Sequence, residues 1–297
     1  MKMQKWPILF AVLAAVLYAL SAPVSKLLLR EVPPAVLAGL LYLGAGIGMG
    51  LLRAAGSCCR LKSKAPGLSR RDLPYTVGMV VLDIAAPLLL LAGLLKTSAE
   101  NVSLMNNFEI VTTAVIALCI FKERISGRLW VAIGLITAAC VLLCAGEREG
   151  FSFSVGSLYV LGACVCWGFE NNCTRMISNK NPLEIVMVKG IGAGAGALLI
   201  AWLLGAKSPS AKYMACSLAL GFVSYGLSIF FYVLSQRYLG AAKTSAYYAA
   251  SPFVGVLLSL VIFKEPPPVL FWAALGLMLA GAYLSATDTR YEAVNKK

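Results

Sequence analysis

Three acidic residues fall inside apolar stretches where a carboxylate is costly. Glu109 stands in NNFEIV, between SAENVSLM and TTAVIALCIF, Glu170 stands in CWGFENN, and Asp83 stands in VVLDIAA. An acidic side chain at the centre of a bilayer costs about 2.5–3.5 kcal/mol on insertion scales, so it normally faces a cavity or a partner. These three acids are therefore the first candidates for a functional site.

Polar side chains accompany Glu109 at helical spacing. Asn106 stands three residues before it and Thr113 four residues after it, which gives an otherwise apolar helix one polar stripe. The acceptors of such a stripe suit a cationic or amine-bearing ligand, which they bind through charge-assisted hydrogen bonds. We therefore assign Asn106 and Glu109 to a substrate site.

Glu170 has an aromatic neighbour as well as polar ones. Trp167 and Thr174 share its helical face, and Asn171 follows it directly. An indole ring attracts a cation to its face, so Trp167 adds a cation–π contact to the acceptors. The expected substrate site therefore also includes Glu170, Trp167 and Asn171.

A structural interpretation of the same acids is also open. Arg175 or Lys189 could neutralise them, or the acids could stay protonated and only hold helices together. Both cations stand near span ends, where long side chains can reach the membrane surface. Glu123 and Glu265 also stand at span ends, and we expect them to cap or gate rather than to contact substrate.

Composition indicates which elements carry these residues. Of the 297 residues, 60% are hydrophobic and 13% charged, whereas soluble domains have about 25% charged residues. The mean hydropathy is +0.81. Apolar stretches of about 20 residues recur, the length that crosses a bilayer as a helix, and they lack the alternation of a membrane barrel. The sequence predicts an all-α membrane protein with ten transmembrane helices, at residues 7–29, 34–53, 73–95, 99–121, 128–145, 154–175, 183–204, 213–236, 241–263 and 267–286.

Basic residues orient these spans. Of the 26 Lys and Arg residues, 18 fall in loops and tails on the side of the N-terminus and 7 in the opposite loops. This asymmetry follows the positive-inside rule and places both termini in the cytoplasm of a multi-pass plasma-membrane protein. The net charge of +13 is thereby explained without nucleic acid as a partner.

Cysteine and histidine usage argues against a metal centre. Seven of the nine cysteines fall in predicted spans, where Cys packs as a small apolar residue. Cys58 and Cys59 stand in a loop expected to face the reducing cytoplasm. The chain has no histidine and no recognisable nucleophile–base motif, so we expect no metal, no cofactor and no enzymatic activity.

The chain contains an internal duplication. FKERISGRLWVAIG, from Phe121, aligns with FKEPPPVLFWAALG, from Phe263, and a row of alternate glycines from Gly44 recurs from Gly190. Such glycines allow close helix packing, and a bendable gating helix is the second interpretation. Each copy holds five spans, so residues 1–149 and 150–297 should insert with opposite orientations. Inverted repeats are characteristic of secondary transporters, with the substrate site between the copies.

These features together resemble a known family. The F-K-E motifs with their following Trp and Gly, the five-plus-five spans and the tract QRYLGAAKTSAYYAASPF are similar to the EamA-type branch of the drug/metabolite transporter superfamily. The resemblance implies ten helices around a central cavity, with the fifth and tenth helices peripheral. It also implies a role in moving amino acids, metabolites or toxic compounds, frequently outward.

The sequence departs from this family pattern beside Glu109. The ninth span has Ser251-Pro252, with a proline typical of the family, where the fourth span has Glu109-Ile110. A carboxylate therefore stands beside the place of the missing proline. Tyr18, the counterpart of Trp167 in the duplication, and Tyr248, within the tract, complete the expected substrate site.

Without histidine, buried carboxylates are the natural proton carriers. Burial disfavours the charged form of a carboxylate, so Glu109 could alternate between protonated and ionised as access switches. We expect Glu109, Glu170 and Asp83 to couple proton movement to exchange, and the chain shows no nucleotide-binding motif for ATP-driven transport.

The sequence thus predicts a secondary transporter that exchanges protons for a small organic cation or amine-containing metabolite and exports it by alternating access. An exporter or facilitator of neutral or zwitterionic amino acids, or of related metabolites, is the alternative. The expected partners are the small-molecule substrate, the lipid bilayer and protons, and a homodimer is left open.

Overall fold

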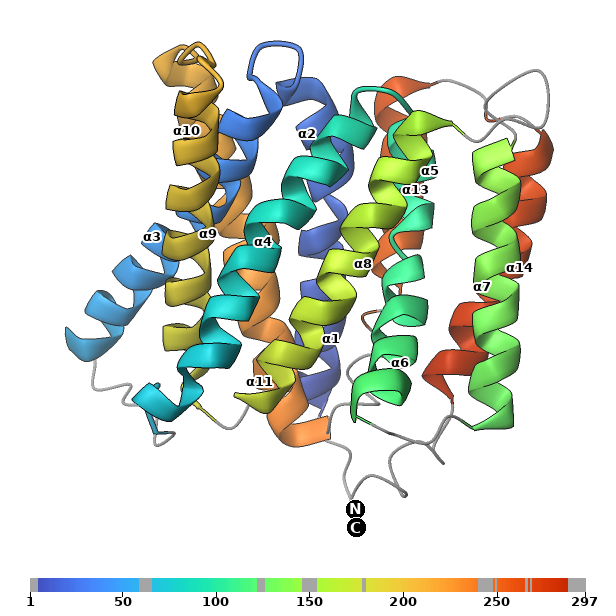
Figure 1. Ribbon diagram of the computed structural model, residues 1–297, viewed down its shortest axis with the longest axis horizontal. Coiled ribbons are helices and arrows are strands. Elements are labelled where there is room, and N and C mark those ends of the chain that lie inside the picture. Colours follow the sequence, from blue (N-terminus) through green and yellow to red (C-terminus); the bar gives the residue numbers. More distant parts are fainter. Residues whose placement is uncertain are drawn as a thin grey trace.

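The protein is helical in every element that the computed structural model describes, and that part of the chain has no strand (Figure 1). The described residues are 5–58, 66–121, 126–145, 154–177, 180–239, 248, 250–264, 267 and 269–287. Glu123 and Glu265, the acids of the F-K-E motifs, lie outside them. In chain order the elements are α1 (Lys5–Ala19), α2 (Ser21–Leu28), α3 (Pro34–Cys58), η1 (Arg70–Asp72), α4 (Leu73–Leu94), α5 (Ala99–Met105), α6 (Phe108–Phe121), α7 (Gly127–Ala145), α8 (Val155–Met176), α9 (Pro182–Leu203), α10 (Ala211–Gly221), η2 (Phe222–Leu227), α11 (Ser228–Leu239), α13 (Ser251–Phe263) and α14 (Val269–Ala286).

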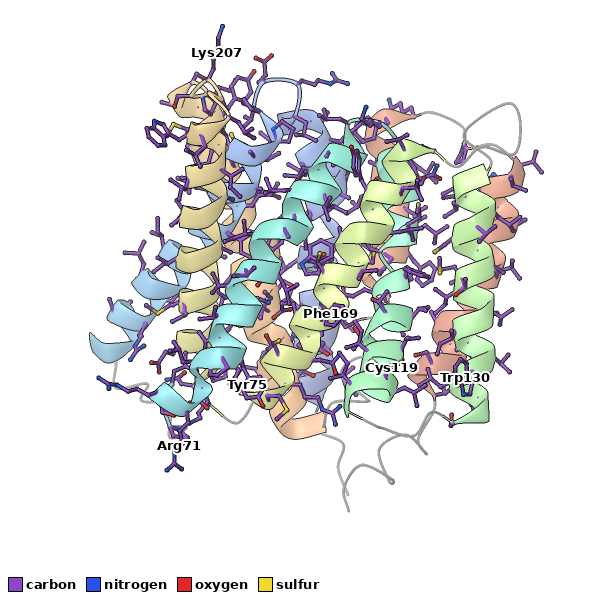
Figure 2. The ribbon with its side chains drawn as sticks, in the orientation of Figure 1. Arg71, Tyr75, Cys119, Trp130, Phe169 and Lys207 are labelled. Atoms are coloured by element: carbon purple, nitrogen blue, oxygen red, sulfur yellow. The ribbon has the colours of Figure 1, made fainter. Side chains whose placement is uncertain are left out.

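Several of these helical segments can cross a membrane. Six are long and apolar enough: Trp6–Leu28, Pro34–Ala55, Arg70–Leu94, Ala99–Ile120, Pro182–Leu203 and Ala211–Tyr232. Three shorter apolar helices accompany them: Gly127–Leu143, Ser251–Phe263 and Val269–Ser285. Large apolar side chains such as Trp130 and Phe169 are exposed on the outside of the bundle, as contact with hydrocarbon requires (Figure 2). This is the architecture of a multi-pass helical membrane protein.

The first predicted span is divided into two helices. α1 ends at Ala19, and α2 begins at Ser21 after Leu20. Pro23 stands four residues after Ala19, and a proline lacks the N–H that would bond that carbonyl and clashes with it. The predicted span 7–29 therefore contains a break that places Ser21 and Ser25, both buried, at the start of a new helix.

The fourth predicted span is also interrupted, at Asn106 and Asn107 between α5 and α6. The Asn107 side chain donates to the Leu104 carbonyl at 3.2 Å, and the Asn107 backbone nitrogen bonds the same carbonyl at 3.2 Å. Asparagine side chains compete in this way with the regular helical ladder. Asn106 therefore belongs to a turn, so the expected stripe of Asn106, Glu109 and Thr113 does not run along one continuous helix.

The eighth predicted span contains a π-helical turn, η2, between α10 and α11. A π-turn adds a residue to the helix and is found frequently at functional sites. Here it carries Ser224 and Tyr225, both buried, toward the interior of the bundle.

The glycine rows of α3 and α9 lie against each other. A methyl group on Gly46 would lie 2.7 Å from the backbone nitrogen of Ile191, and one on Gly190 would lie 2.4 Å from that of Gly46. One on Gly39 would meet Leu198 at 2.6 Å, so the numbering of the two helices runs in opposite directions. These contacts support the packing interpretation of the glycines.

Two further helix pairs are antiparallel. α4 packs along α8, where a methyl group on Gly93 would lie 2.8 Å from the Gly156 carbonyl oxygen and one on Gly78 would lie 3.2 Å from Cys173. α7 packs along α14, and Arg128 at the start of α7 donates to Thr287 just beyond α14. The α7–α14 pair lies at one edge of the bundle, the peripheral place that the resemblance implies for the fifth and tenth spans (Figure 1).

Candidate functional site

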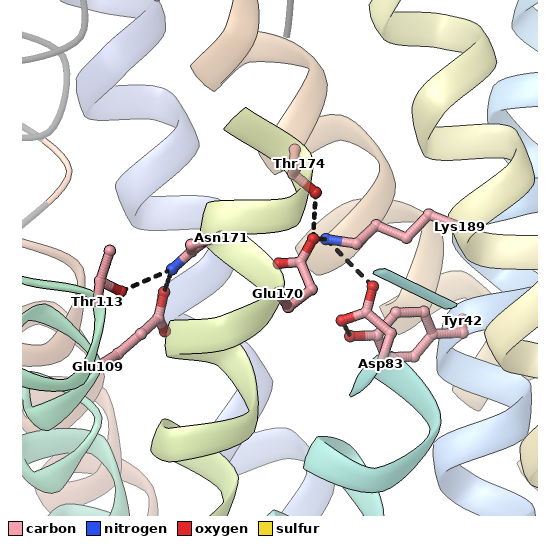
Figure 3. A network of polar contacts seen from close by, with 8 residues as sticks. All are labelled: Tyr42, Asp83, Glu109, Thr113, Glu170, Asn171, Thr174 and Lys189. Carbon is pink, nitrogen blue, oxygen red and sulfur yellow. Dashed lines mark hydrogen bonds and ion pairs between the residues drawn. The ribbon is translucent and has the colours of Figure 1, made fainter. Parts of the chain in front are cut away.

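An ion-paired cluster joins α4, α8 and α9 inside the bundle. The Lys189 ammonium lies 3.2 Å from Oδ2 of Asp83 and 3.0 Å from Oε1 of Glu170 (Figure 3). All three side chains are buried, and that of Asp83 is 0% exposed. Because an isolated buried charge is costly, the ammonium stabilises both carboxylates. Two carboxylates and one ammonium leave a net negative charge when all three are ionised.

Neutral donors complete this cluster. The Tyr42 hydroxyl on α3 donates to Oδ1 of Asp83 at 2.9 Å, and the Thr174 hydroxyl, one turn beyond Glu170 on α8, donates to Oε1 of Glu170. These bonds hold the carboxylates in place and spread their charge over further dipoles. The cluster is therefore fixed by four helices.

Glu109, near the start of α6, has different surroundings. The Asn171 amide donates to its Oε1 at 2.6 Å and to the Thr113 hydroxyl at 3.3 Å (Figure 3). Within the described residues, no Lys or Arg is ion-paired with Glu109. Its side chain is only partly buried. Glu109 is thus a carboxylate held by an amide, without a fixed counter-ion in that part of the chain.

α8 connects the two sets of contacts. Glu170 and Asn171 are consecutive, so they project about 100° apart around the helix. Glu170 points toward α4 and α9, and Asn171 points toward α6 (Figure 3). The next residue, Asn172, donates to the Gly168 and Thr113 carbonyls at 2.8 and 3.3 Å. The consecutive residues Glu170 and Asn171 therefore place one acid beside Lys189 and hold the carboxylate of another, Glu109, by a hydrogen bond.

A chain of tyrosine rings runs beside the acids. Neighbouring ring centroids lie 5.2 Å apart for Tyr42 and Tyr225, 5.8 Å for Tyr225 and Tyr18, 5.9 Å for Tyr18 and Tyr248, and 4.9 Å for Tyr248 and Tyr232. The Ser21 hydroxyl donates to the Tyr225 hydroxyl at 3.1 Å. Since Tyr42 also bonds Asp83, this aromatic chain reaches the ion-paired cluster. Electron-rich rings beside carboxylates are surroundings that attract a cation.

The structure brings several expected site residues together. Glu109 contacts Asn171, and Tyr18 contacts Tyr248. Glu170 and Asp83 share Lys189, one of the two neutralising cations of the structural interpretation. Trp167 is buried in the main hydrophobic core, 5% exposed. In the turn between α5 and α6, the side-chain oxygen of Asn106 is buried without a hydrogen-bond partner.

Lys189, Tyr42 and Tyr225 belong to the site although spacing alone does not single them out. Lys189 does carry a signal, because it is a cation eight residues into an apolar helix. Tyr225 is brought to the site by the π-turn, for which the sequence has no comparable signal. Tyr42 is the tyrosine of α3, and the face of that helix on which it lies, rather than its spacing in the sequence, brings it to Asp83.

The chemistry available here is binding and proton exchange. Among the described residues, no group of three or more His, Cys, Asp or Glu side chains could hold a metal ion. Cys140 and Cys164 are buried. Carboxylates, tyrosine rings and one lysine are groups that can bind an ammonium ion or a proton.

Comparison with known proteins gives three findings. The model of the EamA-like transporter family matches residues 5–145 and again residues 154–287, which confirms the resemblance. An uncharacterized transporter from Methanothermobacter thermautotrophicus is 23% identical over 295 residues, 94% of this chain and 85% of that protein. A solved structure described as the crystal structure of a protein matches with a TM-score of 0.67 at 18% identity, over 94% of this chain and 95% of the other. At this identity, the last match shows a shared fold.

Proposed function

The chain belongs to the EamA-like transporter family, and on this premise we propose that it is a proton-coupled secondary transporter that exports a small organic cation or amine-containing metabolite. The family is one of transporters, which argues for transport rather than catalysis. Substrate, proton coupling and direction are the proposed part.

The contrast between Glu109 and the other two acids carries this proposal. Asp83 and Glu170 both face Lys189, whereas Glu109 is partly exposed and faces the Asn171 amide. A carboxylate without a counter-ion can accept either a proton or a substrate ammonium, and the two compete for the same oxygens. Exchange follows if Glu109 takes a proton on one side and releases it for the amine on the other.

Asp83 and Glu170 have a supporting part in the proposal. With Lys189 they keep a net negative charge near Glu109, which favours a cation in the same region. The rings of Tyr18 and Tyr248 add aromatic faces for the ammonium. Protons and the amine are therefore the proposed partners, within a lipid bilayer.

The helix pairing supports an inverted repeat over residues 1–149 and 150–297. With α5–α6 taken as the fourth span and α10–α11 as the eighth, the pairs α3–α9, α7–α14 and α5–α13 each join a span to its own counterpart. The α4–α8 pair, the third and sixth spans, corresponds to the α11–α1 pair, the eighth and first. A two-fold axis in the membrane plane would generate this pattern, and such symmetry lets a transporter open to either side.

A second candidate function is the movement of a neutral or zwitterionic amino acid, by export or by facilitation. The position of Lys189 beside the acids favours it, because an ammonium fixed within the site could pair with a substrate carboxylate. In that case the substrate would displace Asp83 or Glu170 from Lys189.

Flux measurements on the Glu109→Gln variant test the proposed function. Liposomes that contain the purified protein and enclose a pH-sensitive dye should release protons when an amine from a panel is added outside. The Glu109→Gln variant should lose this response because glutamine cannot titrate. Cys119→Ala, which removes an exposed thiol but no carboxylate from the same helix, is the matched control and should retain it. Equal amine-driven proton flux in Glu109→Gln and in the unaltered protein would show that Glu109 is not the coupling group.

A further inference from the structure

A cavity of about 300 Å³ lies at the end of the molecule opposite the start of α1. The C-terminal ends of α2 and α13 and the segment between α4 and α5 surround it. Leu29, Leu95 and Phe263 form its apolar wall, and Arg30, Ser98 and Glu100 contribute polar groups. Sites for small ligands have this size and this mixture of an apolar wall with a few polar groups. We call this cavity the outer site.

Glu100 gives the outer site a buried negative charge. Its side chain is 6% exposed, and its Oε1 is buried without a hydrogen-bond partner. Glu100 stands in the first turn of α5, where a negative charge is favourable, but that position gives Oε1 no donor. Because a buried acceptor without a donor costs free energy, a ligand ammonium that bonded Oε1 would bind favourably.

Arg30 gives the outer site an exposed positive charge. It stands just beyond α2, and within the described residues its guanidinium forms no ion pair. Lys26, also on the wall, is turned toward the end of α4, where its ammonium donates to the Thr97 carbonyl at 2.6 Å and to the Leu94 carbonyl. Arg30 is therefore the group placed to bind a ligand carboxylate, and its planar fork suits one.

From this arrangement, we propose that the outer site binds a small zwitterion with an apolar side chain, of the class of leucine or phenylalanine. The ligand ammonium would bond Glu100, its carboxylate would bond Arg30, and its side chain would pack on Leu29, Leu95 and Phe263. The outer site is separate from the Glu109 site, since Glu100 lies in the first turn of α5 and Glu109 in the first turn of α6, beyond the turn at residues 106 and 107. The inference does not rest on the proposed function.

A zwitterion bound in the outer site would also affect the movement of α13 relative to α2 and α5. Phe263 is the last residue of α13, whereas the other lining residues come from α2, from α5 and from the segments that follow α2 and α4. A ligand that contacts both walls stabilises the arrangement in which they are close. The zwitterion should therefore hold this end of the bundle closed.

Binding of L-leucine to the purified full-length chain, measured by calorimetry, tests the inference. We expect Glu100→Gln and Arg30→Gln to weaken binding by about tenfold to a hundredfold, the value of a hydrogen bond to a charged group. Glu31→Gln, which alters an exposed neighbour that does not line the cavity, should change nothing. Leu95→Trp, at a side chain that is 51% exposed, should fill the cavity and abolish binding without disturbing the core.

Two leucine analogues show which charged group of the ligand binds Glu100 and which binds Arg30. Leucinol lacks the carboxylate, so its affinity should fall in Glu100→Gln and stay unchanged in Arg30→Gln. The analogue 4-methylpentanoate lacks the ammonium and should show the reverse. The inference is overturned if the unaltered chain does not bind leucine, or if Leu95→Trp and Arg30→Gln bind it as tightly as the unaltered chain. It is also overturned if Glu109→Gln weakens leucine binding and these variants do not, since leucine would then occupy the other site.

Discussion

At the scale of single residues, the donor that faces each buried acid determines what the acid can do. Asp83 and Glu170 lie 3.2 and 3.0 Å from the Lys189 ammonium, whereas Glu109 lies 2.6 Å from the Asn171 amide. A carboxylate opposite a fixed cation keeps its charge, and one opposite an amide gains or loses a proton more readily. Under the proposed function, glutamate therefore has a structural part at Glu170 and an exchanging part at Glu109.

Replacing Lys189 by methionine tests the structural part. The side chain keeps its length, but two buried carboxylates would face each other without a cation, and removal of one partner of a buried ion pair costs about 3–5 kcal/mol. Because protonation of one carboxylate relieves the repulsion, the loss of stability should be larger at pH 8 than at pH 5. Thermal unfolding of the purified protein at the two pH values measures it.

The ion pair of Lys180 with Asp72, at 3.0 Å near the start of α4, provides the control. Lys180→Met removes a cation of the same kind from a pair whose side chains are partly exposed, at 17% and 14%, where solvent screens the charges more than in the buried cluster. We expect a much smaller loss of stability and a weak pH dependence. Equal losses in the two variants would mean that Lys189 does not hold the buried acids together.

At the scale of helices, close approach between α3 and α9 depends on glycine. Gly190→Ala would place a methyl group 2.4 Å from the Gly46 nitrogen, and a backbone atom cannot move aside as a flexible side chain can. The helices should separate, at a cost of about 1–3 kcal/mol. Gly134→Ala, on α7 with no atom within 4 Å, is the matched control and should be neutral or slightly stabilising. Thermal unfolding that ranks the two variants in the opposite order would contradict the packing role.

The sequence predicts the spans but not the breaks within them. A bilayer responds to composition over about 20 residues, so apolar stretches show where helices cross. The break after Ala19 follows from Pro23 and is readable in principle, whereas the turn at Asn106 depends on a side-chain bond from Asn107 to Leu104. The π-turn that carries Tyr225 depends on packing between helices and has no marker in the chain.

The sequence predicts those site residues whose side chains are costly to place inside a bilayer, because such residues are rare in apolar spans. Asp83, Glu109 and Glu170 are evident because acids are rare in apolar spans. Their partners depend on how the helices are rotated against one another, which spacing along one helix does not give. Lys189 therefore meets two acids on α4 and α8, although along the chain it is nearer to the N-terminal end of its own helix.

At the scale of the whole molecule, antiparallel pairing relates the two ends of the bundle. α3 and α9, α4 and α8, and α7 and α14 each run in opposite directions. The sequence nevertheless predicts more Lys and Arg in the loops on the side of the N-terminus, 18 against 7, and Arg71, Arg128 and Lys180 lie at the end where α1 begins. An inverted repeat can thus keep a symmetric helix arrangement while its loops fix one orientation in the membrane.

This predicted charge difference also predicts an orientation in the membrane, which cysteine labelling can test. Arg71 and Lys207 lie at opposite ends of the molecule (Figure 2). In a background with the nine native cysteines replaced, a membrane-impermeant maleimide should label Lys207→Cys in intact cells and Arg71→Cys only after permeabilisation. This expectation follows from the positive-inside rule, by which the end with more Lys and Arg stays in the cytoplasm. Labelling of Arg71→Cys in intact cells would reverse the orientation, and with it the side from which Glu109 would take its proton.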